Sequence, residues 1–142
     1  MSDPGLAAQL ERIADADDFV ESSHELVDEW TSSGLGVETV EPILRFVETH
    51  PHIDFGSPGP LVHFAERFYG YGYEGILLDS LQRRPTALTV WMLNRVINGT
   101  KTPSTRRELI GVMNQITRHP LADDAARQRA QHFVDRSGTI GP

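Results

Sequence analysis

Apolar residues recur at intervals of three and four along most of the chain, which is the spacing of one face of an α-helix. Prolines, glycines and short polar runs interrupt this pattern and mark the helix ends. No segment shows the sustained alternation of apolar and polar residues that is typical of a β-strand. The pattern therefore predicts an all-α fold of about eight helices, over approximately 4–13, 19–30, 37–49, 58–69, 74–83, 86–98, 105–116 and 123–135.

Three of the predicted helix starts rest on capping signals. Asp3 precedes Pro4 and Ser57 precedes Pro58, the order expected of an N-cap residue followed by proline in the first turn. Ser104 or Thr105 is expected to cap the seventh helix in the same way.

The helix predicted over 86–98 is apolar nearly all round, which is typical of a buried central element. We therefore expect Trp91 and Leu93 to be buried in the core. The residues expected to pack around them from the neighbouring helices are Leu77, Leu81, Val112 and Ile116.

Three helix breaks are evenly spaced. Pro51, Pro85 and Pro120 are 34 and 35 residues apart, and an apolar residue stands four positions before each of them (Val47, Leu81 and Ile116). Chance produces such spacings too, but this period is that of arrays of helical hairpins. The repeat favours an irregular HEAT-like arrangement, either an α-α superhelix or a compact bundle, with the first two helices as a cap.

Composition narrows the class of protein. The chain has 142 residues, of which 39% are hydrophobic and 23% charged, as expected for one globular domain (residues 1–136) with a flexible tail (137–142). It has no cysteine, which excludes disulfides, a thiol nucleophile and a thiolate metal site. The first residues lack a basic leader and no apolar run reaches membrane-spanning length, so we expect a cytoplasmic protein without a membrane partner.

The formal net charge of −7 bears on the partner. A nucleic-acid-binding protein normally carries a basic surface, so this charge argues against DNA or RNA and favours a cationic partner. The sequence carries no signal for an oligomeric state.

All three tyrosines lie within five residues, at Tyr69, Tyr71 and Tyr73, among three glycines. Aromatic side chains on a glycine-rich turn are typical of a binding surface, although the same residues also suit a turn packed between helices. Acidic residues nearby would give such a surface a negative rim. The predicted partner-binding residues are Asp54, Glu66, Tyr69, Tyr71, Tyr73, Glu74 and Asp79.

Other kinds of site have weaker support. His50, His52 and His63, with Asp54, suggest a metal site, but no second pair at ligand spacing accompanies them. The glycines at 70, 72 and 75 fit neither a phosphate-binding loop nor a dinucleotide-binding motif. We therefore expect no metal, no cofactor and no enzymatic activity.

Two segments carry a resemblance to a known family. The sequence Asp54-Phe-Gly-Ser-Pro-Gly-Pro-Leu-Val-His-Phe-Ala-Glu66 and the sequence Trp91-Met-Leu-Asn-Arg-Val-Ile-Asn-Gly-Thr100 resemble bacterial immunity proteins of polymorphic-toxin and contact-dependent growth inhibition systems. The resemblance spans roughly Glu21 to His119 in helix order. It implies a small, acidic, cytoplasmic, HEAT-like protein that neutralises a cognate toxin, often a nuclease, without catalysis. It supplies no contact residues, because immunity interfaces diverge with their toxins.

Two functions therefore remain. The first is an immunity protein that neutralises a toxin domain by binding it. The alternative is a HEAT-like adaptor that binds another protein or peptide without catalysis.

Overall fold

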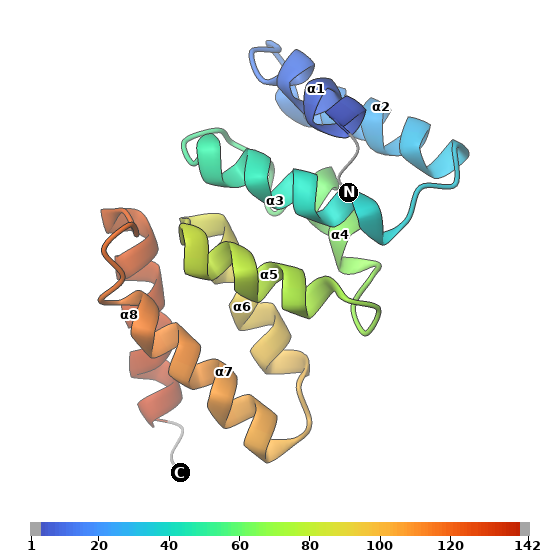
Figure 1. Ribbon diagram of the computed structural model, residues 1–142. Coiled ribbons are helices and arrows are strands. Elements are labelled where there is room, and N and C mark those ends of the chain that lie inside the picture. Colours follow the sequence, from blue (N-terminus) through green and yellow to red (C-terminus); the bar gives the residue numbers. More distant parts are fainter. Residues whose placement is uncertain (1–3, 140–142) are drawn as a thin grey trace. The chain divides into compact units, whose positions relative to one another are not determined.

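The computed structural model describes the backbone of residues 4–139 and the side chains of residues 5–136. Within these residues the chain forms α-helices and one short 3-10 helix, with no β-strand, so the prediction of an all-α fold is confirmed (Figure 1). In chain order the elements are α1 (Pro4–Ile13), α2 (Phe19–Ser32), η1 (Val37–Thr39), α3 (Val40–Thr49), α4 (Pro60–Glu66), α5 (Tyr73–Arg83), α6 (Ala87–Gly99), α7 (Pro103–Ile116) and α8 (Asp124–Thr139).

The helices group into two compact units, Met1–Ile76 and Leu77–Pro142. The boundary falls within α5, so the first unit holds α1 to α4 and the second holds α6 to α8. The single domain predicted over residues 1–136 stays a prediction. The flexible tail predicted over residues 137–142 also stays a prediction: α8 continues to Thr139, and residues 140–142 lie outside the described residues.

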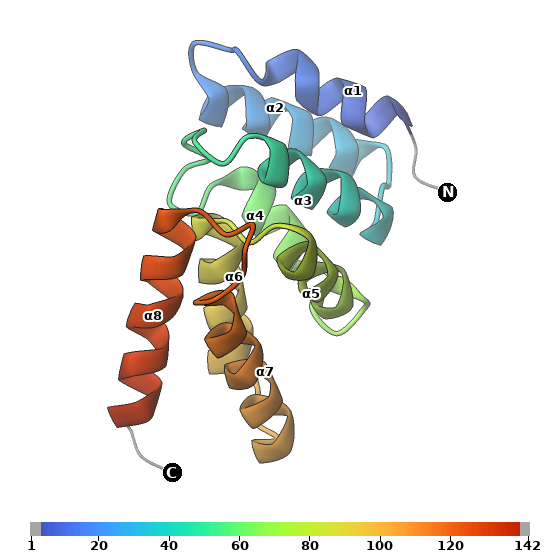
Figure 2. The ribbon, with the colours of Figure 1, turned by 60° about the vertical axis from the view of Figure 1, so that its left-hand side comes forward.

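In the first unit the helices pack in two pairs, α1 against α3 and α2 against α4. Figures 1 and 2 show α1, α2 and α3 side by side. The Asp18 side chain accepts a hydrogen bond from the Glu21 backbone N–H (3.0 Å), which caps α2. Trp30 of α2 is buried, and its indole Nε1–H donates to Gln9 Oε1 of α1 (2.7 Å). This hydrogen bond joins α1 to α2 and satisfies the donor that burial would otherwise leave unpaired.

An aromatic cluster contributes to the core of the same unit. The rings of Phe19 and Phe46 stack with their centroids 6.0 Å apart, and Phe55 meets the Phe19 ring edge-on at 5.4 Å. Phe55 belongs to the loop between α3 and α4 and is 5% exposed. Its ring therefore anchors that loop to the core, since aromatic side chains bury large apolar areas.

The predicted start of α4 is wrong by two residues. The helix begins at Pro60 with Gly59 as the N-cap residue, not at Pro58 with Ser57. Gly59 has φ 100° and ψ 170°, a conformation that no helical residue adopts, so the residues before it cannot belong to the first turn. A Cβ at Gly59 would overlap the carbonyl oxygen of Phe55, and only glycine fits there.

In the second unit α6 packs against both α7 and α8, which also pack against each other. Thr86 and Thr89 form a reciprocal cap at the start of α6: the Thr86 N–H donates to Thr89 Oγ1 (3.0 Å), and the Thr89 N–H donates to Thr86 Oγ1 (3.1 Å). Ala126 and Ala130 of α8 are completely buried, which lets α8 approach its neighbours closely.

The predicted core of this unit is correct in part. Leu93 is fully buried, and Leu77, Leu81 and Ile116 are buried as expected. Trp91 and Val112 are only half-buried, which corrects the prediction for both. Trp91 faces an open groove between α6 and α8, which leaves part of its side chain exposed. The start of α7 is also corrected, because the helix begins at Pro103 and follows Thr102 rather than Ser104 or Thr105.

The three evenly spaced prolines lie where helix breaks were predicted. Pro51, Pro85 and Pro120 follow the ends of α3, α5 and α7. The apolar residues four positions before them, Val47, Leu81 and Ile116, are all buried. The three prolines thus lie between consecutive helices, namely α3 and α4, α5 and α6, and α7 and α8.

Candidate interaction surface

The segment that joins α4 to α5 presents the most exposed aromatic side chain among the described residues. This segment, residues 67–72, is called the tyrosine turn below. Tyr71 is 78% exposed and Tyr69 is 43% exposed. The only other large apolar side chain described as exposed is Leu121 in the second unit. Exposed aromatic rings cost solvation free energy unless a partner covers them, so this turn is the leading candidate for an interface.

Two glycines give the tyrosine turn its shape. Gly70 has φ 84° and Gly72 has φ 110°, both in the region that favours glycine. The Tyr71 N–H donates to the Phe68 carbonyl (2.8 Å), so the chain reverses tightly here. The reversal directs the ring of Tyr71 into solvent.

Glu74 fixes this conformation from the first turn of α5. Both of its carboxylate oxygens accept a hydrogen bond from the Gly70 N–H, each at 3.0 Å. A charged acceptor makes such a bond stronger than a neutral one would. Glu74 was predicted as a rim charge, and the structure gives it this positioning role as well.

Tyr73 was predicted as a contact residue, and the structure corrects this. It is the first residue of α5 and is 1% exposed, so a partner cannot reach it in this conformation. The three tyrosines stand at alternate positions, and only the turn geometry distinguishes the inward ring from the outward ones. The competing interpretation, packing between helices, therefore holds for Tyr73.

The segment Gly36–Glu38 lies beside the tyrosine turn. A Cβ at Gly72 would stand 3.7 Å from Val37 Cγ2, and a Cβ at Gly36 would stand 3.9 Å from Phe68 Cε1. Glu38 is exposed, and its Oε1 accepts the Gly36 N–H (2.7 Å). Hydrogen bonds from the backbone N–H groups of Gly36 and Glu38 lower the pKa of the Glu38 carboxyl group, so it carries its charge to lower pH. Sequence reasoning missed Glu38, because about 30 residues separate it from the turn.

The other predicted acidic residues are distributed more widely. Asp54 is exposed in the loop after α3, where its Oδ1 accepts the Gly56 N–H (3.0 Å). Glu66 at the end of α4 is half-buried and lies 3.8 Å from His63. Asp79 is exposed but belongs to the second unit. The structure therefore brings Tyr69, Tyr71 and Glu74 together, and it does not assign Asp79 to their surface.

A positive charge lies within the same turn. The guanidinium group of Arg67 is 5.2 Å from the centre of the Phe64 ring, and its Nη1 is 3.5 Å from Thr31 Oγ1. These contacts hold Arg67 against α2 and α4. The rim of the turn is therefore predominantly but not wholly acidic.

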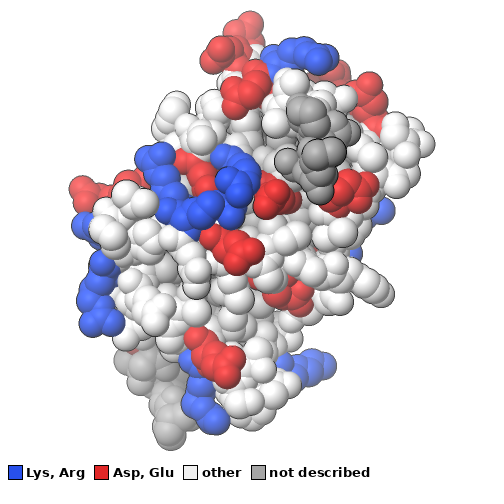
Figure 3. Space-filling view, viewed as in Figure 1, with Lys and Arg blue, Asp and Glu red and all other residues white. Residues whose placement is uncertain are grey.

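Charge is divided very unevenly between the two units, a feature that the net charge of the whole chain conceals. Residues 1–76 contain three arginines, no lysine and 15 acidic residues, a formal net charge of 3 − 15 = −12. Residues 77–142 contain ten basic and five acidic residues, a formal net charge of 10 − 5 = +5. In Figure 3 acidic side chains are the more numerous over α1 and α2, and basic ones over α7 and α8. We call the two parts the acidic unit and the basic unit.

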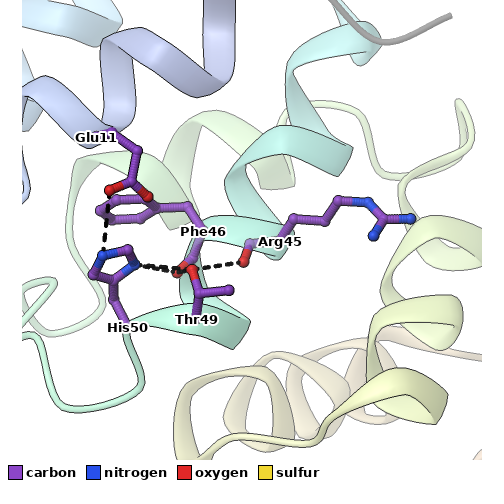
Figure 4. A network of polar contacts seen from close by, with 5 residues as sticks. All are labelled: Glu11, Arg45, Phe46, Thr49 and His50. Atoms are coloured by element: carbon purple, nitrogen blue, oxygen red, sulfur yellow. Dashed lines mark hydrogen bonds and ion pairs between the residues drawn. The ribbon is translucent and has the colours of Figure 1, made fainter. Parts of the chain in front are cut away.

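His50, one of the histidines considered as metal ligands, makes other contacts. Figure 4 shows His50, whose ring stacks on Phe46 with the centroids 4.3 Å apart. Its Nδ1 lies 2.9 Å from Thr49 Oγ1 and 3.1 Å from the Phe46 carbonyl oxygen, and its Nε2 lies 3.5 Å from Glu11 Oε2. Across the described residues, no three His, Asp or Glu side chains converge in a way that would hold a metal ion.

Comparison with known proteins adds no family to these observations. No protein-family model matches the chain, and neither a curated protein nor a solved structure matches it. In the part of the chain that the structure describes, no helix is both long and apolar enough to cross a membrane.

Proposed function

We propose that this protein is a bacterial immunity protein that binds a cognate toxin domain and neutralises it by covering its surface, without catalysis. The proposed contact surface is the tyrosine turn together with the adjoining segment Gly36–Glu38. Its action takes place in the cytoplasm, where such toxins reach their targets.

The observation that carries this proposal is the exposure of Tyr71 on a turn that Glu74 holds in place. Interfaces are dominated by a few large aromatic residues, and a turn whose backbone is already held in place loses little conformational entropy on binding. Tyr71 therefore has the properties of an anchor residue, and Tyr69 adds apolar area beside it.

The charge of the acidic unit supports a cationic partner. A toxin that cleaves nucleic acid presents basic residues to phosphate groups. A surface of the opposite sign accelerates encounter with such a toxin and competes with its substrate. A nuclease domain is accordingly the kind of toxin that this unit suits best.

Binding kinetics with a purified candidate toxin domain test the proposed surface. Tyr71→Ala should raise the dissociation rate by about tenfold or more, the range expected for an anchor residue. Leu121→Ala is the matched control, because it removes a comparably exposed apolar side chain from the basic unit. Equal dissociation rates for the wild type and the Tyr71 variant would exclude the tyrosine turn as the interface.

A second variant tests the charge of Glu74 separately from its role in holding the tyrosine turn. Glu74→Gln removes the charge but keeps an oxygen that accepts the Gly70 N–H. We expect this variant to slow association by about twofold at low salt and to behave like the wild type at high salt, because salt screens surface charges. An association rate that does not depend on salt would contradict electrostatic attraction at this surface.

The function itself is tested in cells. Bacteria that express the toxin domain should survive when this protein is co-expressed and die when it is absent. Equal death with and without the protein would overturn the immunity proposal, whatever the kinetics show.

The alternative of a HEAT-like adaptor is favoured by one observation, the pairwise packing of α1 on α3 and of α2 on α4. Arrays of paired helices commonly bind peptides along one face. An adaptor would bind its partner without protecting cells against the toxin, so the survival assay distinguishes the two functions.

A further inference from the structure

An open groove lies on the basic unit, between α6 and α8. Its volume is about 570 Å³, and its walls come from Ala87 and Trp91 of α6 and from Ala125, Arg129, His132 and Phe133 of α8, with Gln128. The contributing residues of α8 recur at intervals of three and four, so they form one face of that helix over about two turns. None of them belongs to the surface proposed for the toxin.

The walls of the groove combine apolar side chains with the polar side chains of Gln128, Arg129 and His132. Trp91 and Phe133 are half-buried, so part of each ring faces the groove. Ala87 and Ala125 are small, which leaves room for another backbone to approach. Such an arrangement is typical of grooves that receive the apolar face of a helix.

The groove is lined by one cationic side chain, Arg129. Arg129 is exposed and lines it, and no acidic side chain in the described part of the chain forms an ion pair with it. The guanidinium group of Arg95 lies over the Trp91 ring at 5.1 Å from its centre. The basic unit as a whole has a formal net charge of +5. A ligand with both apolar and acidic groups would therefore complement this site.

We propose that the α6–α8 groove is a docking site for an acidic amphipathic helix of a partner protein. The apolar side chains of that helix enter between Trp91 and Phe133, and its carboxylates pair with Arg129, whose planar guanidinium group suits a carboxylate. This proposal does not depend on the immunity function, because it concerns a different unit and a partner of opposite charge.

Two other occupants fit the groove less well. A nucleic acid draws most of its affinity from several phosphate contacts, and Arg129 is the only Lys or Arg among the groove residues. A second copy of this chain has acidic helices, but their apolar faces are buried in its own core. An acidic helix from another protein supplies both kinds of contact.

The intact protein can be tested with a synthetic 16-residue peptide that carries leucines along one helical face and glutamates on the other. Trp91 is the half-exposed tryptophan and Trp30 is buried, so a change in emission reports on the groove. We expect a saturable change with a dissociation constant on the order of 10–100 µM, since the contact area is small. The Trp91→Phe variant should lose the spectral change.

Charge variants test the role of Arg129. Arg129→Gln should weaken binding about two- to fivefold, the effect of one solvent-exposed ion pair. Ala125→Glu should weaken it more than tenfold, because a glutamate four residues before Arg129 pairs with it and repels the peptide. A glutamate in the first turn of α8 also favours the helix, so this variant should fold. Ala8→Glu in α1 is the control, with the same change of residue at an exposed position in the acidic unit.

Four outcomes would overturn the proposal. The first is no saturable change up to millimolar peptide, and the second is an equal response to a scrambled peptide of the same composition. The third is tighter binding of single-stranded RNA, measured by anisotropy and abolished by Ala125→Glu, which would make the groove a nucleic-acid site. The fourth is dimerisation, measured by light scattering, that Ala125→Glu abolishes and the peptide does not affect, which would make the occupant a second copy.

Discussion

The first unit of the chain carries 15 acidic and three basic residues, whereas the second carries five acidic and ten basic ones. Both are nevertheless built in the same way, from helices packed around fully buried leucines such as Leu44 and Leu93. The two units thus have the same kind of core, made of buried apolar side chains, and differ in the charge of their surfaces. Core packing determines the fold, and surface charge determines which partners approach.

The comparison changes the meaning of the net charge of −7. At physiological ionic strength the Debye length is about 8 Å, which is shorter than a helix of six residues. A partner at one surface therefore responds mainly to the charges within about that distance, and the sum of −7 describes neither unit. The expectation of a cationic partner applies to the acidic unit, and the basic unit favours an anionic one.

The largest predicted effect tests whether the two cores are equivalent. Leu44→Ala in α3 and Leu93→Ala in α6 each remove a fully buried side chain. Each should lower the free energy of unfolding by about 2–5 kcal/mol, through lost transfer free energy and the cavity left behind. Urea denaturation followed by circular dichroism measures both. An unchanged midpoint for Leu93→Ala would show that α6 is not part of the core of the basic unit.

The next effect concerns a backbone constraint found in the acidic unit. Gly59→Ala places a Cβ against the Phe55 carbonyl oxygen in a residue with φ 100°. The strained dihedral alone should cost about 1–3 kcal/mol. Thermal unfolding of this variant should show a lower midpoint, and an unchanged midpoint would mean that the loop before α4 adapts freely.

A glycine-to-alanine change in the basic unit is the control for Gly59→Ala. It should change the free energy of unfolding less, and in the opposite direction. Gly111 lies within α7 and is exposed, and a Cβ added there would meet no atom within 4 Å. Gly111→Ala should therefore stabilise the protein by about 0.5–1 kcal/mol, the difference between glycine and alanine in a helix interior. A loss of stability would show that the α7 surface is covered by something at this position.

These glycines also show how far the sequence predicts the fold. Helical spacing and the positions of Pro51, Pro85 and Pro120 predicted the helices and their breaks, because both signals are local. The start of α4 was missed, because the conformation of Gly59 depends on its contact with Phe55 rather than on the capping preference of Ser57.

The candidate surface was predictable to a similar extent. The clustering of Tyr69 and Tyr71 with glycines pointed to an exposed turn, and these two side chains are exposed. The burial of Tyr73 and the proximity of Glu38 depend on how the chain folds back, which no short pattern encodes. The division of charge between the units was readable from the sequence, but only once a boundary near residue 76 was known.

The smallest predicted effect concerns Glu38, and it tests how one surface charge of the acidic unit contributes to stability. Backbone hydrogen bonds hold the pKa of this carboxyl group below its ordinary value of 4.5, the value expected in the unfolded chain. A lowered pKa in the folded state means that folding is favoured when the group is ionised. This contribution is complete above the unfolded pKa and is lost as the pH falls through the folded pKa. Because Glu38 is exposed, solvent screening keeps the contribution small.

Glu38→Gln should therefore reduce the loss of stability as the pH falls below the unfolded pKa, while leaving the stability at neutral pH nearly unchanged, since the glutamine oxygen still accepts the Gly36 N–H. Glu41→Gln is the control, because Glu41 interacts with Arg45 at 3.7 Å on the surface of α3, outside the surface proposed for the toxin. Urea denaturation at a series of pH values measures both variants. A Glu38 variant whose acid-range slope equals that of the wild type would show that the Gly36 N–H does not hold the carboxylate in solution. The segment beside the tyrosine turn would then be more mobile than the structure indicates, and the charge of Glu38 would have no fixed position at the proposed interface.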